Sequence, residues 1–212
     1  MHDLPGLLDL EAEDERTRER YGVGAGVVMS GGQNYAGAWM HDVMVGSAAE
    51  MELDYVVRPV NIMNDDQFAP DFLKISPNNK IPAIVDQETG IHLMESGAIL
   101  MYLAQKAGRL LPQDPDGYWQ TIQWLMWQKS QFGPMLGQAL HFLQIARGKS
   151  PYAEDRFSAE AHRLYGVLER QLENRPFVAG EEFTIADIAI WPWAARHEFQ
   201  SIDLYDYPNA LA

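Results

Sequence analysis

The sequence of 212 residues contains no cysteine. This absence excludes disulfide bonds, thiolate metal sites, C-x-x-C redox centres and cysteine nucleophiles. Any thiol chemistry would therefore have to come from a bound small molecule. The six histidines show no metal-ligand spacing such as H-E-x-x-H, so we expect no metal site either.

Positive charge is also scarce. The chain has 16 Lys and Arg residues against 30 Asp and Glu, which gives a formal net charge of −14. Nucleic acids and anionic membranes are held mainly by Lys and Arg, so we expect neither as a partner. No apolar run approaches the roughly 18 residues of a membrane span. No basic segment followed by an apolar one marks a secretory signal, so we expect a cytoplasmic protein.

Apolar residues make up 47% of the chain, enough to bury a sizeable core. Segments 54–62, 81–86 and 91–94 are β-branched or apolar and predict strands, and the last two are spaced as a hairpin. The residue Pro59 lacks an N–H, which places the first strand at or near a sheet edge. A helix follows Ser96 and ends at Gly108.

The pattern changes after residue 110. Residues 110–117 (LLPQDPDG) are typical of a linker. Apolar residues then recur at helical spacing over 118–132, 152–174 and 184–198. The sequence therefore predicts an α/β domain over residues 1–108 followed by an all-α domain over residues 117–212.

The loop before the second predicted strand reads SPNNKIPAI over residues 76–84. A proline that enters a strand directly after a loop is a candidate for a cis peptide bond. A cis bond at Pro82 would turn the backbone N–H and C=O of Ile81 outward, where an extended peptide can pair with them as an added strand. The alternative is a strand that simply begins with proline.

A second candidate site lies at Glu95 and Ser96. Free N–H groups and the positive end of the helix dipole at Ser96 favour a carboxylate, while Glu95 can receive an ammonium group. Together they can bind the two charges of an α-amino-acid end. The alternative is an ordinary helix cap at Ser96.

An anionic ligand needs nearby cations in so acidic a chain. Lys80 and Arg156 are the candidates. The alternative for Arg156 is a solvated surface charge, which is the usual state of a lone arginine on a helix.

Thr184 and Asp187 have the spacing of a helix capping box. We expect them to fix the start of a buried helix, which is a structural role.

Four strings together resemble the cytosolic glutathione transferases: residues 68–85, 95–100, 133–138 and 184–193 (FAPDFLKISPNNKIPAIV, ESGAIL, GPMLGQ and TIADIAIWPW). The sequence is most similar to the bacterial Nu class, which comprises glutathione-dependent disulfide-bond reductases. The resemblance implies a thioredoxin-like N-terminal domain, an all-helical C-terminal domain, a homodimer and glutathione as cosubstrate.

The resemblance also implies roles for single residues. Ile81 would bind the cysteinyl backbone of glutathione, Glu95 and Ser96 its γ-glutamyl end, and Gln67 and Lys80 its glycine end. Arg156 would reach a glutathione bound mainly to the other subunit. The partners would be glutathione or glutathione disulfide and a small-molecule disulfide or electrophile.

The chain departs from the family at both ends. Residues 1–35 are atypical, because the family's Thr-Pro-Asn-Gly turn, which lies beside the glutathione sulfur, has no counterpart. Ser30, Asn34 or Tyr35 can take this role if the alignment has gaps, and we take Asn34 and Ser30 as the catalytic candidates. The helical domain is short at its end.

Three hypotheses follow. In the first, the protein is a glutathione transferase with disulfide-bond reductase activity, and the thiol of bound glutathione is the nucleophile. In the second, it binds glutathione or another small molecule but is a weak catalyst, because the activating turn is missing. In the third, the altered ends abolish the site and the fold has another small-molecule role.

Overall fold

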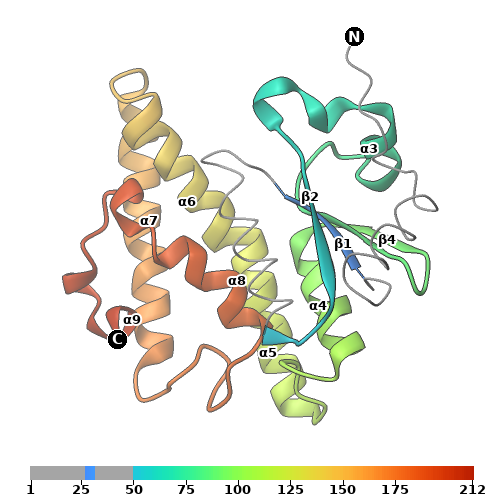
Figure 1. Ribbon diagram of the computed structural model, residues 1–212. Coiled ribbons are helices and arrows are strands. Elements are labelled where there is room, and N and C mark those ends of the chain that lie inside the picture. The colour runs from blue at the N-terminus through green and yellow to red at the C-terminus, as the bar shows by residue number, and fades with distance from the viewer. Residues whose placement is uncertain (1–26, 32–49) are drawn as a thin grey trace. The chain divides into compact units, whose positions relative to one another are not determined.

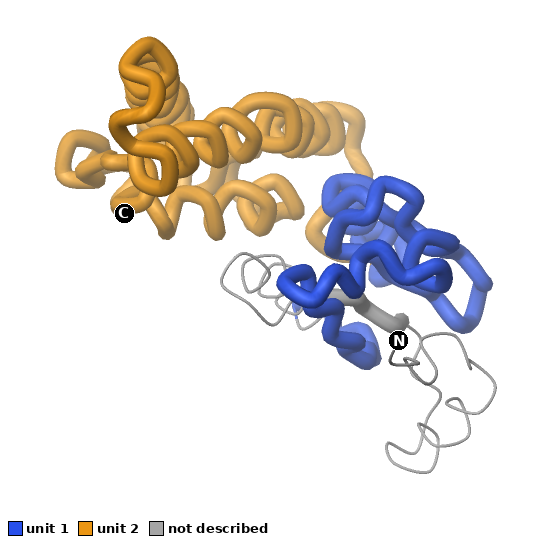
Figure 2. Tube along the Cα trace, turned by 90° about the horizontal axis from the view of Figure 1, so that it is seen from above, with its two compact units in different colours: residues 1–107 blue, residues 108–212 orange. Residues whose placement is uncertain are grey.

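Two units make up the chain, residues 1–107 and residues 108–212 (Figure 2). The computed structural model of the protein describes residues 27–31 and 50–212. The first unit combines strands and helices, and the second is helical.

The described residues of the first unit form a mixed sheet in the strand order β2-β1-β3-β4 (Figure 1). β1 (Val27–Gly31) runs parallel to β2 (Tyr55–Pro59) and antiparallel to β3 (Ala83–Asp86), which forms a hairpin with β4 (Ile91–Met94). β2 lies at an edge of this sheet, as predicted from Pro59. Because no further strand lies on its outer side, the missing N–H of Pro59 costs no hydrogen bond there.

All four residues of β3 are buried, because helices pack on the sheet beside it. Ala83 and Val85 join a core cluster with Phe72 and Ile75 of α3 (Pro70–Ile75). Ile84 points to the opposite face, since side chains alternate along a strand, and β3 also contacts α4 (Ser96–Ala107). Two short 3₁₀ turns, Ile62–Asn64 and Asp66–Phe68, connect β2 to α3.

The sequence placed a helix cap at Ser96, and the structure moves it by one residue. The N–H of Ile99 donates to the carbonyl of Glu95, so Glu95 precedes the helix and Ser96 is its first residue. At the other end, Gly108 adopts φ 67°, a left-handed conformation that favours glycine after a helix, as predicted.

The helical unit opens with a long bent run. It comprises α5 (Pro115–Trp127), a π-helical turn (Gln128–Phe132), α6 (Gly133–Leu140) and a second π-helical turn (His141–Ile145). The first π-turn ends directly before Gly133 and Pro134, and π-turns and prolines are common causes of helix kinks.

α7 (Pro151–Leu172) packs against α6, and α8 (Ile185–Ala194) packs against α5. Ala161, Leu164 and Leu168 are buried on one face of α7, as their helical spacing predicted. Two short 3₁₀ turns, His197–Gln200 and Leu204–Asp206, lead to the terminal turn α9 (Pro208–Leu211).

The capping box at the start of α8 is present as predicted. The N–H of Thr184 donates to Oδ2 of Asp187 over 2.9 Å, and the N–H of Ala186 donates to Oγ1 of Thr184. The other carboxylate oxygen of Asp187 accepts from the N–H of Val178 over 2.8 Å. Asp187 therefore also fixes the loop before α8.

This mixed sheet with its flanking helices is thioredoxin-like, and it is followed by an all-helical unit, so the predicted fold class is confirmed. None of the helices in residues 50–212 combines the length and the apolar character that crossing a bilayer requires.

Candidate functional site

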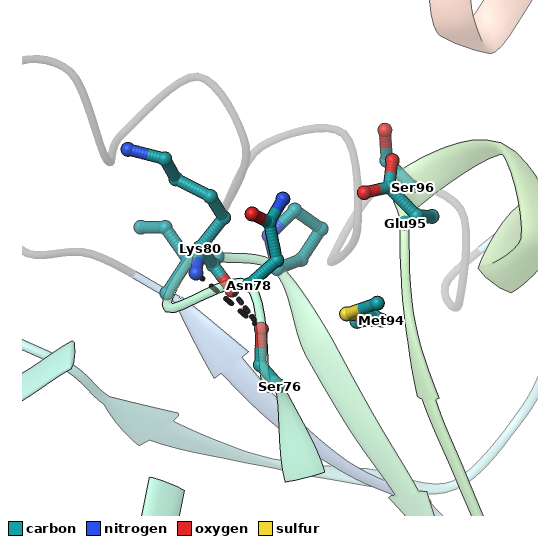
Figure 3. A pocket seen from close by; sticks show the side chains of 8 residues that line it. Ser76, Asn78, Lys80, Met94, Glu95 and Ser96 are labelled. Carbon is teal, nitrogen blue, oxygen red and sulfur yellow. Dashed lines mark hydrogen bonds between the residues drawn. The ribbon is translucent and has the colours of Figure 1, made fainter. Parts of the chain in front are cut away.

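A pocket of about 70 Å³ lies in the first unit. One wall comes from the loop that enters β3, and the other comes from the junction of β4 and α4 (Figure 3). The lining residues are Ser76, Asn78, Lys80, Ile81, Pro82, Met94, Glu95 and Ser96.

The first wall is held by Ser76, whose side chain is fully buried. Its hydroxyl donates to the carbonyl oxygen of Lys80 over 2.8 Å and accepts from the N–H of Lys80 over 3.4 Å. The N–H of Asn79 donates to the carbonyl of Ser76 over 2.9 Å. These bonds close a tight loop that ends one residue before Ile81.

Ile81 presents its backbone at this wall. The Ile81–Pro82 peptide bond is cis, as the sequence suggested. The side chain of Ile81 packs against the core cluster of the first unit. Within the described residues, no hydrogen bond engages the Ile81 N–H or C=O. Both groups are therefore available to an extended peptide ligand.

The second wall is the start of α4. Ser96 lines the pocket as the first residue of this 12-residue helix, whose first N–H groups have no partner within the helix. Glu95 adopts φ 69° and is exposed. An anionic group is favoured at the helix start, and a cationic group is favoured beside the Glu95 carboxylate.

Residues of opposite charge line the two walls of the pocket. Lys80 and Asn78 project from the loop, and Glu95 and Ser96 lie across from them (Figure 3). Neither Lys80 nor Glu95 forms an ion pair with another residue in the described part of the chain. This arrangement suits a ligand with separated positive and negative ends and a peptide-like middle.

A partly buried network holds the far end of α4 against the sheet. The Nζ of Lys106 in α4 lies 2.7 Å from Oδ2 of Asp86, and the hydroxyl of Tyr102 donates to the same oxygen. Burial would raise the pKa of Asp86, but the hydrogen bonds from Lys106, Tyr102 and the N–H of Glu88 outweigh it, and the pKa is lowered. The network ties the end of β3 to α4.

The remaining predicted residues lie elsewhere. Gln67 belongs to the 3₁₀ turn Asp66–Phe68 and does not line the pocket. Its Oε1 atom is buried and has no hydrogen-bond partner among residues 27–31 and 50–212. Ser30 lies in β1 and pairs with Ala83, two residues after Ile81. Asn34 and Tyr35 lie outside the described residues.

Arg156 lies on α7 in the helical unit, in a separate pocket of about 330 Å³. A hydrogen bond from Arg163 is the main cause that lowers the pKa of Glu160, and the charge of Arg156 contributes further. Arg156 is therefore close to Glu160. The other lining residues are Met135, Phe157, Ala159, Glu160 and Arg163.

The sequence reasoning missed three lining residues, Ser76, Asn78 and Met94. Ser76 and Asn78 stand in the same SPNNKIP string that pointed to Ile81, so a closer examination of this loop could have found them. Met94 could have been found as the residue before Glu95. Residues 27–31 and 50–212 contain no cluster of His, Asp or Glu that could hold a metal ion.

Comparison with known proteins gives matches in both units. Residues 34–105 match the glutathione S-transferase N-terminal domain, and residues 151–208 match the glutathione S-transferase C-terminal domain. The first match contains every residue of the pocket described above.

The chain is also similar to individual proteins. It is 49% identical over 164 residues to disulfide-bond oxidoreductase YfcG of Escherichia coli K12, which covers 75% of this chain and 76% of YfcG. It is 47% identical over 137 residues to disulfide-bond oxidoreductase YghU of the same organism, covering 63% of this chain and 47% of YghU. The chain thus aligns with about half the length of YghU.

A solved structure shows the same fold. The glutathione transferase from Pseudomonas putida, with one glutathione disulfide bound per subunit, superposes with a TM-score of 0.79 at 37% identity, covering 94% of this chain and 90% of that one. Because the domain matches and the identity to YfcG extend over most of both chains, this protein belongs to the glutathione S-transferase family, in the group of YfcG and YghU.

Proposed function

We propose that this protein is a glutathione-dependent enzyme that reduces disulfide bonds. The observation that carries the proposal is the position of the unpaired Ile81 backbone between Lys80 on one wall and Glu95 with Ser96 on the other. Glutathione is an extended tripeptide with a zwitterionic γ-glutamyl end and a carboxylate at its glycine end, so its groups match this order.

Each part of the ligand has a partner. The Ile81 N–H and C=O pair with the cysteinyl backbone as a strand edge does. Ser96 and the start of α4 receive the γ-glutamyl carboxylate, and Glu95 receives the γ-glutamyl ammonium. The Lys80 ammonium receives the glycine carboxylate. Gln67 does not line the pocket and its Oε1 atom is buried, so it takes no part in this arrangement.

The reaction is a thiol–disulfide exchange. The thiolate of bound glutathione attacks one sulfur of the substrate disulfide, which forms a mixed disulfide and releases the other sulfur as a thiolate that takes up a proton. A second glutathione thiolate attacks the glutathione sulfur of the mixed disulfide. The products are glutathione disulfide and the second substrate thiol, so two glutathione molecules supply the two electrons.

A hydrogen bond to the sulfur favours the thiolate and so activates the nucleophile. We assign this role to Ser30 or Asn34. Ser30 stands in β1 opposite Ala83, which follows Ile81 by two residues, and Ile81 binds the cysteinyl residue in this proposal. Asn34 follows β1 by three residues. A chain without cysteine needs this borrowed thiol for such chemistry.

We further propose that the protein works as a homodimer in the cytoplasm. Arg156 would extend from α7 of one subunit to a glutathione bound mainly by the other, which adds a cation to a strongly acidic protein. A cytoplasmic glutathione pool is kept reduced, and it would supply the cosubstrate. The names of YfcG and YghU, both disulfide-bond oxidoreductases, support the proposed reaction.

The test is reduction of a small model disulfide by glutathione, with and without the protein, coupled to consumption of NADPH by glutathione reductase. We expect a rate that rises in proportion to the protein concentration and exceeds the rate with glutathione alone. A protein that binds glutathione but gives no added rate would instead be a binding module, and this result would overturn the proposal.

A further inference from the structure

Ser76 is the C-cap residue of α3, directly before the loop that leads to the pocket. Its side chain is fully buried, yet both of its hydroxyl hydrogen bonds go to the backbone of a single exposed residue, Lys80. Figure 3 shows these two bonds at the base of the pocket.

A buried hydroxyl costs free energy unless it is hydrogen-bonded, so these two bonds keep Ser76 in its place and Lys80 in its conformation. The loop between them is also closed by the bond from the N–H of Asn79 to the carbonyl of Ser76 over 2.9 Å. Asn79 itself adopts φ 48°, in the left-handed region that asparagine tolerates. The backbone from which the Lys80 side chain emerges is thus fixed before a ligand arrives.

Lys80 is the last residue of this hydrogen-bonded loop and directly precedes Ile81, which lines the pocket and binds the cysteinyl residue in the proposed function. A fixed backbone at Lys80 fixes the point from which its side chain extends. Such pre-organisation increases affinity because less conformational entropy is lost on binding. The benefit applies mainly to the ligand group that the Lys80 ammonium contacts.

We propose that Ser76 is a positioning residue for the glycine end of glutathione, acting through the backbone of Lys80. This inference rests on the proposed function, in which Lys80 receives the glycine carboxylate. Ser76 therefore contributes to the choice between glutathione and γ-glutamylcysteine, which lacks the glycine residue.

The experiment compares two ligands and four forms of the protein. Dissociation constants for glutathione and γ-glutamylcysteine are measured by calorimetry with the natural protein and with the Ser76→Ala, Ser76→Thr and Lys106→Met variants. Ser76→Thr keeps the hydroxyl. Lys106→Met weakens the partly buried network at the far end of α4 and serves as a destabilised control outside the pocket.

For Ser76→Ala we expect the Kd for glutathione to rise about tenfold, and that for γ-glutamylcysteine to rise no more than about twofold. The preference for glutathione should therefore shrink in Ser76→Ala, remain in Ser76→Thr, and remain in Lys106→Met despite its lower melting temperature. An equal loss for both ligands in Ser76→Ala would show a general structural role and overturn the inference.

The two proposals fail in different ways. If the natural protein does not bind glutathione, the proposed function fails and the inference fails with it. If the natural protein binds glutathione but Ser76→Ala keeps the full preference for it, only the inference fails. If Ser76→Ala does not fold, amide hydrogen exchange of the natural protein tests the inference instead. We expect the Lys80 N–H to be protected from exchange without ligand. Exchange at the rate of an open loop would contradict the hydrogen bonding between Ser76 and Lys80.

Discussion

The Nζ atom of Lys106 lies 2.7 Å from Oδ2 of Asp86, and this contact joins the last turn of α4 to the end of β3. Asp86 is fully buried, and the Lys106 side chain is 19% exposed. The contact therefore holds in place the helix whose first residues, at its other end, form one wall of the glutathione pocket.

We predict that Lys106→Met lowers the free energy of unfolding by about 2 kcal/mol, because it leaves the buried Asp86 carboxylate with fewer partners. Urea denaturation measures the change. The matched control is Lys74→Met. Lys74 lies 2.7 Å from Asp71, but both side chains are more than half exposed, so we expect a change below about 1 kcal/mol. Equal losses in the two variants would contradict the importance of burial.

The same network predicts an acid dependence of stability. The folded state lowers the pKa of Asp86 below its ordinary value of 3.8, so the unfolded state takes up protons first as the pH falls. The contribution of Asp86 is therefore complete above about pH 4 and is lost progressively below it. Asp86→Asn should be less stable than the natural protein at pH 7, and this difference should narrow towards pH 2.5. A difference that stays constant with pH in urea denaturation would refute this account.

The capping box gives a prediction for the helical unit. Thr184→Ala should cost about 0.5–2 kcal/mol of stability. Asp187→Ala should cost more, because Asp187 accepts hydrogen bonds from the N–H groups of Thr184 and Val178 and from the Thr184 hydroxyl. Thermal denaturation ranks the two variants, and the opposite ranking would show that the loop contact to Val178 contributes little.

Glu95→Gln tests the γ-glutamyl end of the proposed ligand. The variant keeps the shape of the side chain but removes the charge that receives the ammonium, so we expect the Kd for glutathione to rise about tenfold. The control is Glu173→Gln, which removes an exposed charge that does not line the pocket. If both variants weaken binding equally, the effect comes from the net charge of the protein and not from Glu95.

Much of the fold was predictable from local pattern. The hairpin of β3 and β4, the edge strand at Pro59 and the α8 capping box each depend on residues close together in the sequence. The Asp86–Tyr102–Lys106 network was not predicted, because its members meet only after α4 packs against the sheet. Periodicity and turn signals carry no information on such long-range pairs.

Part of the candidate site was also predictable from the sequence. The structure brings Lys80, Ile81, Glu95 and Ser96 to one pocket, although two of these residues lie about fifteen positions from the others. The role of Ser76 was missed because a serine before a proline is usually a turn residue, and only the fold shows that its hydroxyl is buried against the backbone of Lys80. Arg156 lies in the other unit, so its link to the site remains a proposal.

The central claim is that the protein uses the thiol of bound glutathione to reduce disulfides. Its most direct test is the initial rate of model-disulfide reduction at fixed glutathione, measured for the natural protein and for Glu95→Gln. The account predicts a protein-dependent rate for the natural protein and, below saturating glutathione, a several-fold lower rate for Glu95→Gln that recovers as glutathione is raised. A rate no greater than that of glutathione alone would contradict the account.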